Sequence, residues 1–581
     1  MSELLPSENA MMGSTDDPKD YFVVPDRDFS NYYYTGLASR PPVIATSYPR
    51  PQLIPASNGD HNAHPFRKTL HPLRGSHPLA RMWDTGFAME IMEILKEMDV
   101  DWTSMDPVHM SMLDIRDQIG MEMRTREQFL GPAIIWIGVQ PGTLEFDKGG
   151  LVAAKCQRAV ERNGIEDCYV EIRESVVVKI GCEDGGMRFL DLSGEGKKGC
   201  GWIGEFRDAF CATLSFPVAA ARMPERVGTA GFYVGSGREG DDDVYLVTAR
   251  HVVLGDEAFE ESQGEYVGVG GKVQGNEEVV LMGNNLLGEK LWRMNTTIKG
   301  LQESIRQIGA EIETEKDFRM LEKLLSKECH KLASAQELYE KICSGLGPLD
   351  NRVFGELVWA PPITPSMTAG SSDTTLDLAI IKINPGKLDK KNFLGNVMDI
   401  GYSHRNNRML EILSKEPLAS TLDPKISWVG HVKLDGQMAE TEVFNHPSTD
   451  GTDEEPRMVF KHGTTSHVTF GECIGTPCYT RRVHRNIVII SREWGIIGRK
   501  MDSRGGDQTS FGVEGDSGAC VVDLQLRICG IVIAAAGYRG SLGDKRRGTN
   551  ITYVTPVHQI MEALHRSKFF EKAHLDPAVA L

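Results

Sequence analysis

The sequence lacks both an apolar run long enough to cross a bilayer and an excess of positive charge. A membrane helix needs about 18 or more consecutive apolar residues, whereas the nearest candidate, Ile528 to Ala536, is short and typical of a buried strand. The formal net charge is −17, from 64 Lys and Arg against 81 Asp and Glu. Because binding to phosphates requires a surplus of Lys and Arg, we expect neither a membrane nor a nucleic acid as partner.

Signals for export and for metal binding are also scarce. The first residues are acidic where a secretory signal has a basic start and an apolar core. We therefore expect an intracellular protein, cytoplasmic or nuclear, whose 11 cysteines are reduced. Cys473 and Cys478 have no second Cys or His pair at zinc-ligand spacing nearby. No metal and no organic cofactor is expected.

The chain, at 581 residues with 40% hydrophobic residues, is long enough for two or more domains. Residues 1–80 contain many prolines, which interrupt helices and strands, and are predicted to form a disordered arm. Residues 81–203 have the strand–helix–strand order of a small α/β domain. Residues 204–570 consist of short β-rich runs between Gly-containing turns, typical of an antiparallel barrel or sandwich, and 571–581 remain as a tail.

A heptad pattern interrupts the β-rich region at 285–345. Apolar residues recur at alternating spacings of four and three from Leu287 to Ile312, and again from Phe318 to Ile342. We expect two helices folded back as an antiparallel hairpin, either an insertion that packs only its own seam or an arm for self-association or partner docking. A second insertion, 436–456, is polar and acidic and is expected to be a mobile loop.

Three short motifs in the β-rich region carry reactive side chains. Gly515-Asp516-Ser517-Gly518 places a serine in a Gly-flanked turn, where its hydroxyl can be exposed and backbone N–H groups can converge. An apolar strand runs into Thr248-Ala249-Arg250-His251, although a single histidine in this position is more often structural. Asp377 begins another apolar strand, and a buried carboxylate needs a partner such as an imidazole N–H.

In the order His, Asp, Ser, these motifs resemble those of the trypsin-like serine peptidases. TARH stands where that family has Thr-Ala-Ala-His, DLAIIKI where it has Asp-(Ile/Leu)-Ala, and GDSG matches its nucleophile motif. Val459 to Gly471 (VFKHGTTSHVTFG) resembles a strand-turn-strand block of many bacterial and fungal members. Gly530 to Gly537 is similar to the strand beside the substrate cleft, and Thr552 to Leu564 to the last strand and helix. The resemblance covers about residues 205–568.

The resemblance implies a multidomain protein containing an all-β double barrel of the chymotrypsin type, with the helical hairpin inserted and the α/β domain and arm preceding it. It also implies a triad of His251, Asp377 and Ser517, with Gly515 and Ser517 donating N–H groups to an oxyanion. The implied substrate pocket comprises Phe511, Ile533 and Ala535. Phe511 stands where a carboxylate would select Lys or Arg, so an uncharged or shallow pocket is expected.

The sequence departs from the family in three respects. The interval from His251 to Asp377 is unusually long, and the helical hairpin accounts for much of the excess. Secreted relatives have a cysteine after the histidine, whereas this chain has Val252, as expected in a reducing compartment. No Arg-Ile-Val-Gly-Gly activation site precedes the first strand, so Asp516 needs a partner other than a freed N-terminus.

These features favour a serine endopeptidase that cleaves protein or peptide substrates through an acyl-enzyme intermediate. Two alternatives remain open. One is a catalytically silent scaffold for protein–protein interaction, against which the intact triad counts. The other is a hydrolase of esters or other acyl groups.

Overall fold

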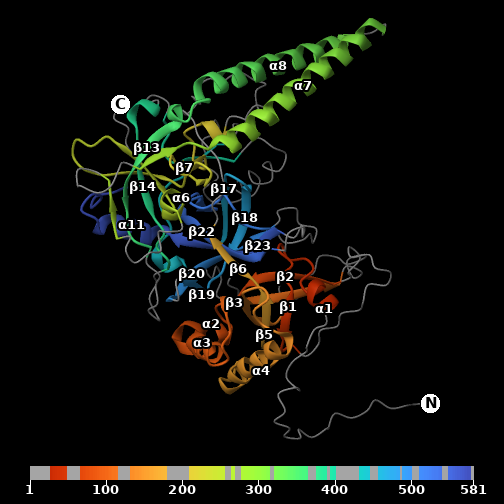
Figure 1. Cartoon of the computed structure of the whole chain (residues 1–581), viewed down its shortest axis with the longest axis vertical. Helices are drawn as coiled ribbons and strands as arrows, with labels where there is room; N and C mark the ends of the chain where they lie inside the picture. Colours follow the sequence, from red (N-terminus) through yellow and green to blue (C-terminus); the bar gives the residue numbers. More distant parts are fainter. Residues whose placement is uncertain are drawn as a thin grey trace.

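The computed structural model describes residues 27–48, 66–114, 131–179, 208–255, 264–268, 277–314, 319–363, 374–388, 393–400, 431–444, 456–484, 487–499, 509–539 and 547–577. The protein is multidomain and mostly β. An N-terminal unit lies at one end, a β-rich body in the middle, and two long helices project from the other end (Figure 1). Within these ranges no helix is long and apolar enough to cross a membrane, and the nine cysteines are free thiols.

The N-terminal unit is a mixed sheet covered by helices. Its strand order is β1 (Val43–Thr46), β5 (Cys168–Glu174), β4 (Ala133–Val139) and β3 (Trp102–Asp114), with β2 (Phe66–Pro72) also on β3. β4 and β5 are parallel because the helix α4 (Phe146–Arg162) connects them as a crossover. The apolar faces of α3 (Ala88–Glu97) and α4 share one hydrophobic cluster with the sheet.

The prediction of a disordered arm over residues 1–80 is wrong for the part of it that the structure describes. The helices α1 (Arg27–Tyr32) and α2 (Pro78–Met82) and the strands β1 and β2 all lie there. Tyr33 and Tyr34 are buried and donate hydrogen bonds to Glu171 at 2.6 and 2.7 Å. Pro72 ends β2 and Pro78 begins α2, positions at which a missing N–H is tolerated. The α/β unit therefore begins well before residue 81, and residues 1–26 and 49–65 lie outside the described ranges.

The β-rich body contains two large sheets and a separate pair of strands. Six strands form a closed antiparallel ring in which each strand pairs with the next and the last returns to the first. In ring order they are β17 (Met458–Gly463), β18 (His467–Cys473), β20 (Ile487–Arg499), β23 (Arg547–Pro556), β22 (Ile528–Arg539) and β21 (Cys520–Asp523). The ring is followed by the helix α11 (Val557–Arg566).

The second sheet of the body has eight strands. Seven are ordered β8 (Gly228–Thr229), β7 (Pro217–Ala220), β12 (Glu278–Val280), β13 (Val353–Ala360), β14 (Ala379–Ile383), β10 (Val244–Thr248) and β9 (Tyr233–Gly235), and β11 (Tyr266–Val267) pairs with β13. A separate pair consists of β15 (Val397–Asp399) and β16 (His431–Lys433). The end of the chain packs on this sheet, since Gly235 N–H donates to the His574 carbonyl at 2.9 Å.

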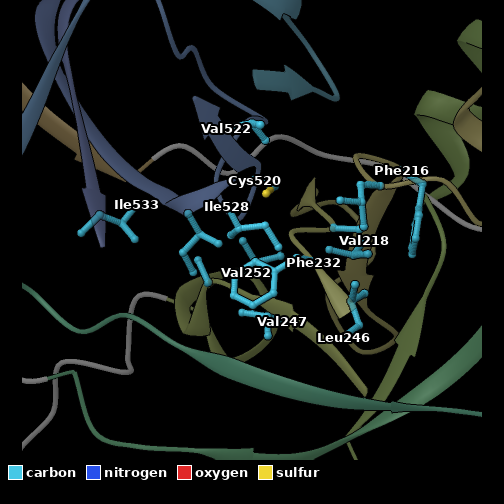
Figure 2. Packing of buried hydrophobic residues seen from close by; sticks show 14 of the residues in the cluster. Phe216, Val218, Phe232, Leu246, Val247, Val252, Cys520, Val522, Ile528 and Ile533 are labelled. Atoms are coloured by element: carbon cyan, nitrogen blue, oxygen red, sulfur yellow. The ribbon is translucent and has the colours of Figure 1, made fainter. Parts of the chain in front are cut away.

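The two sheets of the body share a hydrophobic core. Figure 2 shows Val247 of the eight-stranded sheet and Phe232, just before β9, near Cys520 and Ile528 of the closed ring, with Phe216, just before β7, further along the same core. All of these side chains are buried. Because interiors are packed as densely as organic crystals, this core fixes the position of one sheet against the other.

The helical hairpin occupies the predicted place, between β12 and β13. Its helices are α7 (Asn284–Thr314) and α8 (Arg319–Leu346), which lie against each other and extend away from the body (Figure 1). Seam residues such as Met294, Ile298 and Ile342 are buried. Trp292, by contrast, is 66% exposed on α7.

The mobile loop predicted for 436–456 is wrong for its first part. Met438 is fully buried in the core of the closed ring, and its N–H donates to the Ile528 carbonyl at 2.9 Å. Val443, slightly further along the chain, is buried in the same cluster. Burial of these two apolar side chains stabilises the packing of this otherwise polar segment against the closed ring. Residues 445–455 lie outside the described ranges.

The N-terminal unit meets the body along two strand pairings, called here the first and second seams. In the first seam β3 pairs with β19 (Cys478–His484), which in turn pairs with β20. In the second seam β6 (Val176–Lys179), which follows β5 after Ser175, pairs with β22. Figure 1 shows β6 between the N-terminal unit and β22. The two units thus share a continuous set of strands.

Candidate active site

Pairing of two strands brings the predicted histidine and aspartate together. β10 runs into the short helix α6 (Arg250–Leu254), which contains His251, and Asp377 directly precedes β14. β10 and β14 are antiparallel, with Thr248 opposite Ala379, so the two side chains emerge at the same end of the pair. His251 Nδ1 lies 2.7 Å from Asp377 Oδ2. The N–H of His251 also donates to Asp377 Oδ1, at 3.1 Å.

Ser517 reaches this pair from the other sheet, in the turn that leads into β21. Its Oγ lies 2.9 Å from His251 Nε2. Ionised Asp377 can only accept hydrogen bonds, so Nδ1 carries the ring proton of a neutral imidazole and the Nε2 lone pair faces the serine hydroxyl. The three side chains are 3%, 0% and 0% exposed in the order His251, Asp377, Ser517. This arrangement can transfer a proton from the serine to the imidazole, which makes the serine a nucleophile.

The turn around Ser517 depends on close approaches of the backbone. Gly518 has φ +90°, and a Cβ there would lie 2.2 Å from the Thr229 carbonyl oxygen. Thr229 also donates from its Oγ1 to the Gly515 carbonyl at 2.7 Å, and from its N–H to the Ser517 carbonyl at 2.7 Å. The segment holding the two predicted oxyanion donors, Gly515 and Ser517, is therefore anchored to the eight-stranded sheet through Thr229.

The partner that Asp516 needs is Lys461, a role that the sequence did not reveal. Lys461 Nζ lies 3.1 Å from Asp516 Oδ2, and both side chains are fully buried. Ser466 Oγ donates to Asp516 at 2.6 Å, and the N–H groups of Thr465 and Val513 add bonds of 3.1 and 2.9 Å. Burial raises the pKa of the Asp516 carboxyl, but Lys461 and these donors outweigh it and leave the pKa below its ordinary value.

A sequence signal for Lys461 did exist. It lies in the VFKHGTTSHVTFG block, and the block forms the β17–β18 hairpin that the resemblance implied. What the sequence could not show is that this hairpin places an ammonium group next to the turn of the reactive serine, since residues 461 and 516 are far apart along the chain.

The three residues of the predicted substrate pocket do not share one site. Phe511 and Ala535 lie in the same buried cluster inside the closed ring, whereas the Ile533 side chain belongs to the core between the sheets. Ile533 lies at a register shift between β22 and β23, which breaks the alternation that would put 533 and 535 on one face. Its carbonyl does lie at the active site, since Ser517 Oγ is 3.4 Å away.

Comparison with known proteins leaves the site to be judged on its own geometry. No protein-family model matches the sequence, and no curated protein matches it. Among the described residues, no three or more His, Cys, Asp or Glu side chains form a group that could hold a metal ion. The hydrogen-bonded chain of Ser517, His251 and Asp377 is the feature from which function is argued.

Proposed function

We propose that this protein is a serine endopeptidase of the trypsin-like type, with His251, Asp377 and Ser517 as its triad. The observation that carries the proposal is the position of His251, whose two ring nitrogens lie 2.7 Å from Asp377 and 2.9 Å from Ser517. The closed ring of six antiparallel strands, packed against a second sheet with the triad between them, supports the chymotrypsin-type fold. Free cysteines support the reducing, intracellular location expected from the sequence.

In this proposal His251 accepts the proton of Ser517 Oγ as that oxygen attacks the carbonyl carbon of a peptide. The tetrahedral intermediate collapses to an acyl-enzyme, and His251 gives the proton to the departing amine. Water then attacks the acyl-enzyme by the same route and releases the acid. Asp377 positions the imidazole and stabilises its charged form. The N–H groups of Gly515 and Ser517 would bind the oxyanion, each contributing about 3 to 4 kcal/mol in the transition state.

Two other functions use the same residues differently. A silent scaffold would need the folded body but no reactive serine, and the nearly complete burial of His251 and Ser517 is the observation in its favour. An ester hydrolase would use the same triad on a different acyl group. Turnover of a peptide compared with that of the matching ester separates the ester hydrolase from the peptidase.

The first test is labelling of the full chain with a fluorophosphonate, which forms a covalent bond only with an activated serine. We expect labelling of the wild type, its complete loss in Ser517→Ala, and loss of at least 100-fold in rate in Asp377→Asn, because the imidazole then takes the wrong tautomer. Ser491→Ala, which changes another buried serine, is the control and should label normally. Equal labelling of wild type and Ser517→Ala would contradict the proposal.

A further inference from the structure

One edge of β22 carries the reactive turn and a strand of the N-terminal unit in succession. β21 pairs as far as Ile531, where its partner is Cys520. Next along the edge, Gly518 N–H donates to the Val532 carbonyl at 2.7 Å, and Val532 N–H donates to the Ala519 carbonyl at 3.0 Å. Beyond Ile533, β6 pairs with residues 534–537. β23 occupies the opposite edge over this whole length.

The C-terminal end of β6 is directed toward the serine. Val176 is opposite Gly537 and Lys179 is opposite Ala534, so the C-terminal end of β6 is the end closest to Ile533. The Ile533 carbonyl oxygen is 3.4 Å from Ser517 Oγ. An extended peptide bound on this edge in the same direction would deliver the carbonyl groups that follow it to the nucleophile. Strand addition to an open sheet edge is a general way of binding peptides.

We infer that β6 occupies the place of a peptide substrate on β22 and thereby inhibits the active site of its own chain. This inference rests on the proposed function, which makes Ser517 the nucleophile. Ser517 and His251 are 0% and 3% exposed although the site must admit a polypeptide, so part of the chain has to move before a substrate binds. An external peptide can reach Ser517 only after β6 has left the edge of β22.

The connection of β6 to the rest of the N-terminal unit makes it a strong competitor. Ser175, the residue before β6, is fully buried, and its N–H donates to the Val139 carbonyl at 2.8 Å. Thr103 Oγ1 donates to the Ser175 carbonyl at 3.0 Å. A strand held this close to its binding edge has an effective concentration on the order of millimolar or above. A free peptide must exceed that concentration or bind more tightly.

The ladder of β6 can nevertheless open without unfolding its anchor. It consists of four residue pairs, and the side chains of Val176 and Val177 are only half-buried. Short edge strands with few buried apolar contacts open more readily than the core. The anchor at Ser175 belongs to the N-terminal sheet and stays in place when β6 leaves β22.

The test is the substitution Val177→Pro in the full chain, with Val177→Thr as matched control. Proline removes an N–H and fixes φ, so it weakens pairing with β22, whereas threonine keeps both the backbone and the β-branched shape. We expect Val177→Pro to raise the initial rates of fluorophosphonate labelling and of peptide cleavage at least 10-fold, and Val177→Thr to match the wild type. A milder variant, Val177→Gly, should give an intermediate increase and serves if the proline variant does not fold.

A second measurement tests the occupancy of the edge without any catalysis. In the Ser517→Ala background, hydrogen exchange at residues 534–537 should accelerate in Val177→Pro, and the synthetic peptide Val-Val-Val-Lys should slow it again. In the catalytically intact Val177→Pro, the same peptide should inhibit cleavage competitively. Faster exchange with unchanged labelling, or no effect of the peptide, would overturn the inference. If the peptide restores protection but no variant ever labels, the edge binds β6 as inferred and the proposed enzymatic function is what fails.

Discussion

The two seams between the N-terminal unit and the body are built in different ways. At the first seam, buried side chains join the units. The Tyr553 hydroxyl of the body donates to Asp106 of the N-terminal unit at 3.0 Å, and Asp106 forms an ion pair of 3.1 Å with Arg173 of its own unit, with both side chains 0% exposed. Trp83 Nε1 also donates to the Pro477 carbonyl, at 2.9 Å. At the second seam, β6, whose Val176 and Val177 are half-buried, meets β22 through a short main-chain ladder.

This difference assigns a different role to each seam. Opening the first seam would leave buried polar groups such as Asp106 with fewer hydrogen-bond partners, so the first seam is the harder of the two to open. A main-chain ladder consists of backbone hydrogen bonds alone. Any extended peptide can therefore take the place of β6 on this edge without leaving a buried charge unpaired. The N-terminal unit can therefore remain attached through the first seam while the second seam opens at the active site.

The largest effect is expected from Arg173→Met, which breaks the buried ion pair behind the first seam. It leaves Asp106 as an uncompensated buried charge and removes the guanidinium that stacks on Trp136, 3.3 Å from the ring centre. We expect the free energy of unfolding to fall by about 3 to 5 kcal/mol, measured by urea denaturation. Arg162→Met removes the exposed ion pair with Glu90 in the same unit and should change it by about 1 kcal/mol or less.

The double variant Arg173→Met with Asp106→Asn sharpens this prediction. Removing both charges avoids the uncompensated carboxylate, so much of the lost stability should return. If the single and double variants are equally unstable, packing rather than charge accounts for the stability that Arg173 contributes.

A smaller effect is expected from Tyr553→Phe at the same seam. The change removes one hydroxyl that donates to the buried Asp106, and one lost hydrogen bond to a buried group costs about 1 to 3 kcal/mol. Tyr245→Phe removes a hydroxyl that donates to the half-exposed Asp241 and should cost less, because water can replace it. A larger loss in Tyr245→Phe would contradict the view that burial gives the first seam its strength.

The smallest effect is on the pH dependence of stability. Burial raises the pKa of Asp106 above its ordinary value of 3.8, although Arg173 and Tyr553 oppose the shift. Above pH 3.8 the unfolded chain loses this proton before the folded chain does, so the contribution of Asp106 to stability falls as pH rises to its folded pKa. Wild type should therefore lose stability relative to Asp106→Asn over that window in pH-dependent urea denaturation. Val177→Pro should follow the wild type, because its change lies at the second seam.

Several features could be read from the chain because they depend on local patterns. The heptad spacing predicted helices where α7 and α8 lie, and the strand–helix–strand order predicted within residues 81–203 is present as β4, α4 and β5. The motifs around His251, Asp377 and Ser517 pointed to one site, and the structure brings these three side chains within hydrogen-bonding distance. The predictions of disorder and mobility from local composition were wrong where a few side chains are buried in a core, as at Tyr33, Tyr34 and Met438.

Other features followed only from contacts between residues remote in sequence. Lys461 reaches Asp516 because β17 pairs with β21, and the register shift at Ile533 is a property of the β22–β23 pair. The pairing of β6 with β22 was equally hidden, because a run of valines matches any open sheet edge. The spacing of apolar residues and the chemistry of short motifs are encoded locally in the sequence. The choice of partner strand depends instead on which sheet edge remains open, and that edge exists only once the whole chain has folded.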